Sequence, residues 1–300
     1  MNIFSKITIC LLSMATVFAG DYGSFERIAE PMAPRNIQIL LEKETDGALL
    51  ELKGPYYIFN PEDGSRISSG LLGKRFMVHE QENGLKWGEQ FVDIHQIYIK
   101  PRSSETSIFI NGIQYAGSIA IYGVNGTINI VNDIEIEQFV KSTLTTQFLT
   151  PLEPEVMSAL AILARTDAYY QVTRANPGSF WHISTQEMNY QGSALVVSHS
   201  SIDRAVDSTR HLILLHPNHG RDLPFATTWT ENSAGKTATY NSIFRKDTSA
   251  PQKGVVAPLA AIIREDTKWS YRIGKKTLAH LLDAREILSL IHISEPTRPY

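Results

Sequence analysis

Five turn dipeptides recur at short intervals through the first half of the chain. They are Gly54-Pro55, Asp63-Gly64, Asn83-Gly84, Asn111-Gly112 and Asn125-Gly126, and they separate short apolar runs rich in Tyr, Ile, Phe and Val. Asn-Gly and Asp-Gly readily adopt the positive backbone angles of two-residue hairpin turns, and the runs between them have the length of strands. The pattern predicts that residues 36–132 form an all-β region of hairpins, with each strand burying one face.

The pattern changes at Asp133, and helical spacing follows. Residues 134–140 are expected to begin a helix, with Asp133 as an N-cap that accepts bonds from unpaired amides. The strongest helix is predicted over residues 155–172, directly after Pro154, where apolar residues recur at helical spacing. An alanine stripe on this helix should let another element approach closely: Ala159, Ala161, Ala164 and Ala168. Further elements are expected as a helix over residues 201–210, a strand over 212–215 and a helix over 279–286.

These patterns together predict an α+β protein. A β-rich N-terminal region, residues 36–132, is followed by a mixed core, residues 133–273, that contains one long Ala-rich helix. The length suits one large domain or two ordinary ones.

The first 19 residues have the pattern of a secretory signal peptide. Lys6 precedes an apolar run over residues 7–18, and Val17 and Ala19 occupy the positions that a signal peptidase reads. We expect cleavage after Ala19 and export to the periplasm or to the outer face of the cytoplasmic membrane. An uncleaved leader that anchors the chain is the alternative, although the run is shorter than the ~20 apolar residues of a membrane-spanning helix.

Composition narrows the possible partners. Cys10, the single cysteine, lies in the leader, so the mature chain would have neither a disulfide nor a thiolate ligand. The 31 acidic and 28 basic residues nearly balance, and no Lys/Arg cluster stands out. Nucleic acid is therefore not an expected partner, whereas a near-neutral surface suits an uncharged ligand such as a glycan.

The C-terminal segment has a different character from the rest of the chain. Residues 288–298 read LSLIHISEPTR, which looks like the translation of a sequencing-library adapter. We therefore expect residues 288–300 to be an artefact and not part of the fold. The alternative is an ordinary amphipathic tail.

Two blocks in the mixed core carry a resemblance to a known family. Residues 139–148 read FVKSTLTTQF and residues 155–166 read EVMSALAILART. They resemble the SpoIID/LytB family of stage II sporulation protein D-like lytic transglycosylases and amidase enhancers, in which Tyr-Leu-Lys-Gly-Val-Val-Pro-Ser-Glu-Met precedes a helix ending in Ala-Arg-Thr. Weaker blocks at residues 205–215 and 225–237 extend the resemblance, which spans residues 36–273. It implies remodelling of peptidoglycan glycan strands, in cell division or in sporulation.

The resemblance places the family's catalytic acid at Gln147. A lytic transglycosylase cleaves between MurNAc and GlcNAc with one carboxyl group that acts first as acid and then as base, which leaves a 1,6-anhydro end. The amide of Gln147 cannot exchange a proton near neutral pH, and general acid-base assistance is worth ~10²–10⁴ in rate. Most turnover should therefore be lost.

Three interpretations of Gln147 are open. The protein binds glycan without cutting it, as a cell-wall protein that recruits or activates an amidase. Alternatively, a neighbouring carboxylate supplies the proton, with Glu153, Glu155 and Glu135 as candidates. In the third interpretation Gln147 is a surface amide of an envelope scaffold module that has no glycan site.

Further residues are candidates for substrate binding. Arg165 and Thr166 end the Ala-rich block, where a guanidinium could bind sugar hydroxyls or a lactyl carboxylate. An intramolecular partner for Arg165, such as Asp167 or Asp133, is the alternative. The resemblance adds three residues from a segment that partly matches the family's Ser-Gly-Gly-x-Thr loop: Ser233, Gly235 and Thr237.

No cofactor or metal is expected. Some members of the family bind zinc through a Cys-Asp-Thr-Thr-His-Cys segment, and this chain has residues 182–187, HISTQE, in its place. His182 and Glu187 alone are too few for a zinc site, which takes four ligands.

Overall fold

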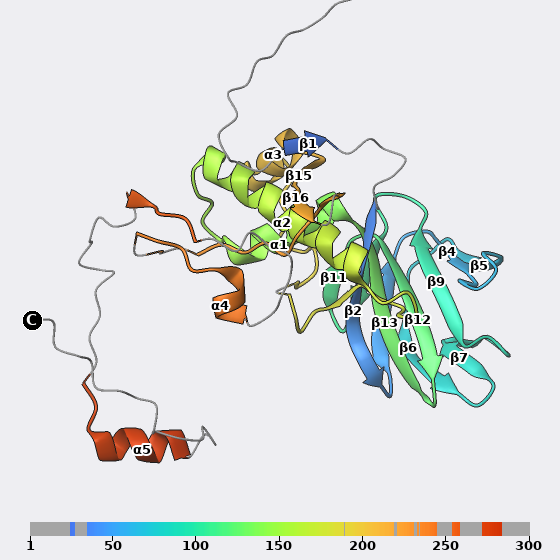
Figure 1. The fold of residues 1–300 in the computed structure, drawn as a ribbon. Helices are drawn as coiled ribbons and strands as arrows, with labels where there is room; N and C mark the ends of the chain where they lie inside the picture. Colours follow the sequence, from blue (N-terminus) through green and yellow to red (C-terminus); the bar gives the residue numbers. More distant parts are fainter. Residues whose placement is uncertain are drawn as a thin grey trace, which may run out of the picture. The chain divides into compact units, whose positions relative to one another are not determined.

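The computed structural model describes residues 25–27, 35–188, 190–218, 221–230, 233, 235–244, 254–258 and 272–283 (Figure 1). The predicted signal peptide, residues 1–19, and the adapter-like tail, residues 288–300, lie outside them. The described residues form two compact units, the first within Met1–Trp229 and Tyr240–Gln252 and the second within Thr230–Thr239 and Lys253–Tyr300.

The first unit begins with a β-rich region. Its strands are β2 (Asn36–Thr45), β3 (Ala48–Lys53), β4 (Tyr56–Phe59), β5 (Arg66–Gly70), β6 (Lys74–Gln81), β7 (Gly84–Trp87), β8 (Glu89–Gln90), β9 (Gln96–Pro101), β10 (Ser107–Ile110), β11 (Ile113–Tyr115), β12 (Ser118–Val124) and β13 (Thr127–Glu135), joined by β14 (Ile183–Ser184). A seven-stranded sheet has the order β14-β2-β13-β12-β9-β4-β5, and a six-stranded sheet has the order β11-β10-β3-β6-β7-β8. The prediction of an all-β region is confirmed.

The Asn-Gly dipeptides make the hairpins that the sequence predicted. Asn111 and Gly112 join β10 to β11 with φ angles of 50° and 84°, and Asn125 and Gly126 join β12 to β13 with 54° and 83°. Two successive positive angles match the right-handed twist of the strands that they connect.

The core of this region lies between the two sheets. Fully buried isoleucines alternate along adjacent strands of the seven-stranded sheet: Ile97, Ile99, Ile119, Ile121, Ile128 and Ile130. They belong to one hydrophobic cluster with Leu50, Val78 and Trp87 of the six-stranded sheet. Each such side chain contributes ~1.5–3 kcal/mol through its burial.

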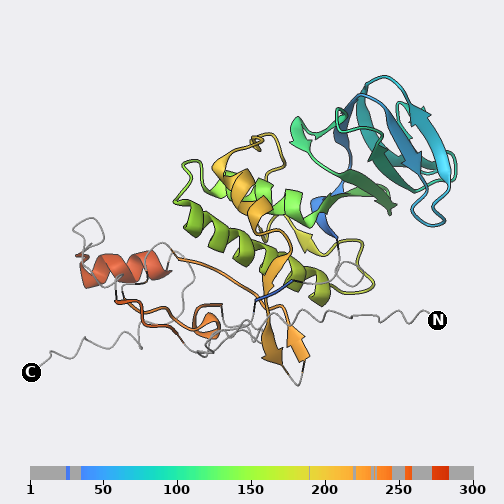
Figure 2. The same ribbon diagram turned by 90° about the horizontal axis from the view of Figure 1, so that it is seen from above.

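Three helices pack together beside the sheets (Figures 1 and 2). They are α1 (Ile136–Gln147), α2 (Pro154–Arg174) and α3 (Ser201–Ser208), and each contacts the other two. α1 and α2 also contact β2. The predicted long helix is α2, with Pro154 in its first turn. Of its alanine stripe, three members are buried and Ala159 is exposed.

The prediction of Asp133 as an N-cap is wrong. β13 continues to Glu135, and α1 begins at Ile136. Asp133 pairs with Ser118 and Gln38 within the sheet, and its carboxylate accepts hydrogen bonds from Asn36 Nδ2 at 2.6 Å and from the Tyr98 hydroxyl at 3.2 Å. The buried Ile130 and Ile134 stay in the core only if the strand continues through this position.

Short elements complete the two units. In the first unit, β1 (Phe25–Arg27) pairs with β15 (Leu212–Leu214), β16 (His216–Asn218) pairs with β17 (Arg221–Leu223), and α4 is Tyr240–Phe244. The second unit contains a bridge between Lys236 and Val256 and the helix α5 (Lys275–Asp283), which overlaps the predicted residues 279–286. Among the described helices, none has the length and apolar character needed to cross a membrane.

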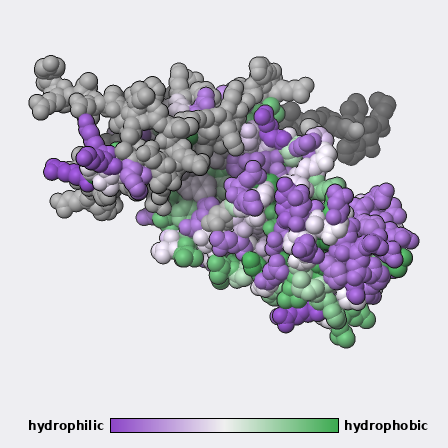
Figure 3. Space-filling model, turned by 90° about the horizontal axis from the view of Figure 1, so that it is seen from below, coloured by the Kyte–Doolittle hydropathy of each residue, from purple (hydrophilic) through white to green (hydrophobic). Residues whose placement is uncertain are grey.

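One face of the molecule is drawn by hydropathy in Figure 3. Hydrophobic side chains form separate patches there, between hydrophilic ones. Scattered apolar residues of this kind are ordinary on a folded surface. The candidates for a functional site are therefore the pockets and the clusters of polar side chains.

Candidate functional site

A buried ion pair joins the start of α1 to the middle of α2. Arg165 is fully buried, and its Nε and Nη2 donate to the two carboxylate oxygens of Glu137 at 2.9 and 2.8 Å. The guanidinium also donates to the carbonyl oxygens of Leu212 at 3.0 Å and Val206 at 3.1 Å. The charges and the remaining donors are thereby satisfied, as burial of a guanidinium requires.

Arg165 and Thr166 are therefore structural in this fold. Both are fully buried, so neither can touch a sugar directly, and the interpretation of them as substrate contacts is wrong. Thr166 Oγ1 donates to the Ile162 carbonyl at 2.7 Å and accepts from the Leu214 amide at 2.9 Å, which ties α2 to β15. Arg165 does have a partner within the chain, as the alternative interpretation predicted. That partner is Glu137, which the sequence did not single out, rather than Asp167 or Asp133.

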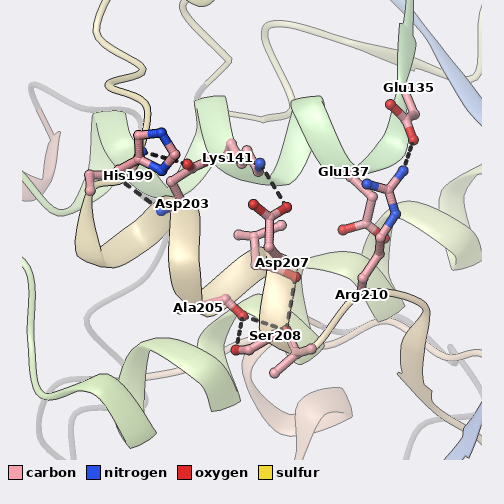
Figure 4. A network of polar contacts seen from close by, with 12 residues as sticks. Glu135, Glu137, Lys141, His199, Asp203, Ala205, Asp207, Ser208 and Arg210 are labelled. Atoms are coloured by element: carbon pink, nitrogen blue, oxygen red, sulfur yellow. Dashed lines mark hydrogen bonds and ion pairs between the residues drawn. The ribbon is translucent and has the colours of Figure 1, made fainter.

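A second ion-pair cluster fastens α1 to α3 (Figure 4). Lys141 Nζ lies 2.5 Å from a carboxylate oxygen of Asp203 and 2.8 Å from one of Asp207. The hydrogen bond from Lys141 lowers the pKa of Asp203 below its ordinary value. Burial acts to lower the pKa of Lys141, but the hydrogen bonds to both carboxylates outweigh it, and this pKa is raised.

Glu135 is also engaged in an ion pair. Its carboxylate accepts a hydrogen bond from Arg210 Nη2, and Figure 4 shows the two side chains pointing toward one another beside the α1–α3 cluster. Glu135 was one of the carboxylates proposed to replace the missing acid. The pair joins the end of β13 to the residues that follow α3, so Glu135 makes a contact within the chain.

Gln147 is the last residue of α1 and is exposed to solvent. A pocket of about 230 Å³ opens beside this helix end, lined by Thr145, Phe148, Leu149, Pro151, Leu195, Val197, Ser200 and Ile202. We call it the α1-end pocket. Its lining is apolar except for two hydroxyl side chains, Thr145 and Ser200, and it contains no carboxylate. Gln147 is adjacent to it in sequence and is not part of its lining.

The two remaining carboxylates that could replace the missing acid lie at the start of α2. Glu153 is the residue before the helix and Glu155 is in its first turn, and both are exposed. Sequence reasoning did not consider Asp167 as a proton carrier, yet burial raises its pKa above the ordinary value. Its oxygens accept from the Thr227 amide at 3.3 Å and from Gln171 Nε2 at 3.4 Å. These bonds hold the carboxyl group within the packing of α2.

The three loop candidates belong to the second unit. The carbonyl of Ser233 accepts from the Lys236 amide at 3.0 Å, and the carbonyl of Gly235 accepts from the Ala257 amide at 2.9 Å. Thr237 Oγ1 accepts from the Val255 amide at 2.8 Å. Gly235 has a φ of 94°, which favours glycine. The segment is thus a turn held against residues 255–257.

Residues 182–187, which replace the family's zinc-binding segment in the resemblance, are bonded to other groups of the chain. His182 Nδ1 accepts from the Gln38 amide at 3.0 Å, and Glu187 Oε2 accepts from the Ser184 amide at 3.3 Å. Burial lowers the pKa of His182. Within the part of the chain that the structure describes, no group of three or more His, Cys, Asp or Glu residues has the arrangement of a metal site.

The site thus belongs to an α+β protein in which polar residues of α1 hold three helices together and Gln147 lies at an open helix end. A family model described as "Stage II sporulation protein" (SpoIID) matches residues 124–216, which include α1, α2 and α3. The chain belongs to the SpoIID family. This membership indicates a function related to the cell wall and its peptidoglycan.

Similar proteins come from two bacterial groups. A protein of Chlamydia muridarum is 35% identical over 204 residues, which cover 68% of this chain and 69% of that protein. One of Chlamydia pneumoniae is 34% identical over 218 residues, with 72% and 78% covered. One of Brachyspira hyodysenteriae is 30% identical over 197 residues, which cover 65% of this chain and 51% of that protein. No solved structure matches the chain.

Proposed function

We propose that this SpoIID-family protein is exported and binds the glycan strands of peptidoglycan at the exposed end of α1, without cleaving them at the rate of a lytic transglycosylase. The observation that carries the proposal is Gln147. It is exposed at the position of the family's acid, beside a pocket whose lining holds no carboxylate. An amide there can hydrogen-bond a sugar but cannot protonate a leaving oxygen.

Apolar walls with a few hydroxyl groups are a suitable surface for a sugar. Phe148 lines the α1-end pocket, and its ring centroid lies 6.2 Å from that of Trp229. Sugar rings present apolar C–H faces to such side chains and hydroxyl groups to Thr145 and Ser200. In this role the protein would hold strands for an amidase or present them to it.

A substitution that restores the acid tests the proposal directly. Gln147→Glu should produce 1,6-anhydro-MurNAc ends from denuded glycan strands, about 10²–10⁴ faster than the wild type, because it supplies the missing proton carrier. Thr150→Glu, which adds a carboxylate at an exposed position of the loop that follows α1, is the control and should stay inactive. Mass spectrometry of the products gives the readout.

The outcomes separate the interpretations. Anhydro ends produced by the wild type at the rate of Gln147→Glu would show that another carboxyl group carries the proton. Failure of the wild type to sediment with purified sacculi would instead favour a scaffold without a glycan site.

A further inference from the structure

A second and larger pocket lies at the edge of the β-rich region, outside the α1-end pocket. It has a volume of about 540 Å³ and is formed by β2, β10, β11 and the segment that follows β14. We call it the β11 pocket. Its volume falls in the range of ~300–1,000 Å³ that is usual for small-molecule sites.

The chemistry of the lining selects a class of ligand. Glu42, Gln114, Thr185 and Gln191 provide a carboxylate, two amides and a hydroxyl group, and Ile113 belongs to the apolar part. Among the described residues that line this pocket, none is a Lys or Arg, so a phosphate or a free carboxylate would meet no counter-charge. A sugar with an acetamido group fits, because its methyl group suits the apolar wall and its amide suits Gln114 or Thr185.

The two pockets share one stretch of chain. Ala194 lines the β11 pocket, and the next residue, Leu195, lines the α1-end pocket. Consecutive Cα atoms are ~3.8 Å apart, so the two pockets are separated by a single residue step along this segment. Both pockets therefore border one segment of the chain, as the subsites of a single extended polymer do.

The residues that lead into the shared segment are held by the surrounding fold. The carbonyl of Gln114 accepts from the Ser193 amide at 2.8 Å, and a side chain at Gly192 would lie 2.3 Å from the same oxygen. Tyr190 donates to Asn132 Oδ1 at 2.6 Å, and its ring lies 5.6 Å from that of Phe139 of α1. These contacts fix residues 190–193 to β11, β13 and α1, so this side of the β11 pocket is preformed.

We propose that the β11 pocket is a further sugar subsite, specific for an N-acetylated sugar, and that one glycan strand runs from the end of α1 along residues 190–202 into it. This inference rests on the proposed function and extends it, because it assigns part of the glycan site to the N-terminal β-rich region. A strand bound in both pockets is held more tightly than one that reaches only the first.

Binding of neutral chito-oligosaccharides of increasing length, measured by calorimetry, tests the subsite. The wild type should bind a hexasaccharide at least about tenfold more tightly than a disaccharide, since the additional hydrogen bonds and burial are worth about that factor. Ala194→Trp fills the β11 pocket from an exposed position and should abolish this gain with length. Gln114→Leu should reduce it.

A matched control variant separates the possible results. Ser104→Trp, an equally large addition at an exposed position outside both pockets, should keep the wild-type dependence on length. A gain with length that persists in Ala194→Trp and Gln114→Leu would overturn the subsite and leave the proposed function standing. A wild type that binds neither chito-oligosaccharides nor denuded glycan strands would overturn the proposed function and the subsite together.

Discussion

The two ends of α1 use polar residues in opposite ways. At the first turn, the buried Glu137 pairs with Arg165, and Lys141 one turn later is held by two aspartates. At the last turn, Gln147 is exposed beside a pocket. The charged residues of α1 thus hold the helices together, whereas Gln147, where we propose that the glycan binds, is open to solvent. A family motif therefore contains structural and chemical positions that only their surroundings distinguish.

The largest expected effect comes from breaking the buried pair. Arg165→Met leaves the buried Glu137 carboxylate without its guanidinium partner and should lower the free energy of unfolding by about 3–5 kcal/mol, measured by urea denaturation. The double variant Glu137→Leu with Arg165→Met should lose less, because no unpaired charge remains. Equal losses in the single and double variants would contradict a buried ion pair at this end of α1.

A smaller effect is expected where Tyr190 contacts β13. Tyr190→Phe removes the hydroxyl group that donates to Asn132 Oδ1 and leaves this buried oxygen without that bond. The loss should be about 1–3 kcal/mol in the same measurement. Tyr57→Phe, at a half-buried position, serves as the control and should change stability little. A neutral Tyr190→Phe would mean that the segment 190–194 is not held by this bond.

The pair of Lys141 and Asp203 should make stability depend on pH. Because the pKa of Asp203 is lowered from 3.8 in the folded state, its ionised form stabilises the fold above that pH, and this contribution is lost as pH falls through the lowered value. Asp203→Asn should reduce the free energy of unfolding at neutral pH by about 1 kcal/mol. It should also make this free energy depend less on pH in the acid range. Chemical denaturation across the acid range measures both, and parallel curves for the two proteins would contradict the assignment.

The smallest effect on stability is expected at the open end of α1. Gln147→Ala should change the free energy of unfolding by less than about 0.5 kcal/mol, as surface substitutions usually do. Binding to denuded glycan strands should nevertheless weaken by about threefold to tenfold, because one hydrogen-bonding side chain is lost. A variant that loses stability and binding in proportion would show that this end of the helix is structural too.

Much of the fold follows from local signals. The turn dipeptides and the short apolar runs between them predicted the β-rich region, and Pro154 followed by apolar residues at helical spacing predicted α2. The error at Asp133 has a physical cause. A capping residue and a strand residue with polar partners look alike in sequence, and only the pairing of β13 with its neighbours decides between them.

The site was less predictable than the fold. Arg165 and Thr166 were singled out as binding residues because guanidinium and hydroxyl groups are chemically able to bind sugars. Their burial depends on where α3 and β15 pack against α2, and no local pattern encodes that. The β11 pocket was not predicted for the same reason, because its walls come from β2, β11 and a segment many residues later.

The sequence by itself determined the alternation of strands and turns, the long helix and the amide at position 147, because each depends on residues that are neighbours along the chain. Only the tertiary structure decided which polar groups are buried. A charge can be buried only when a residue of opposite charge, such as Glu137 for Arg165, lies next to it. Residues this far apart in sequence are brought together only by the packing of the folded chain.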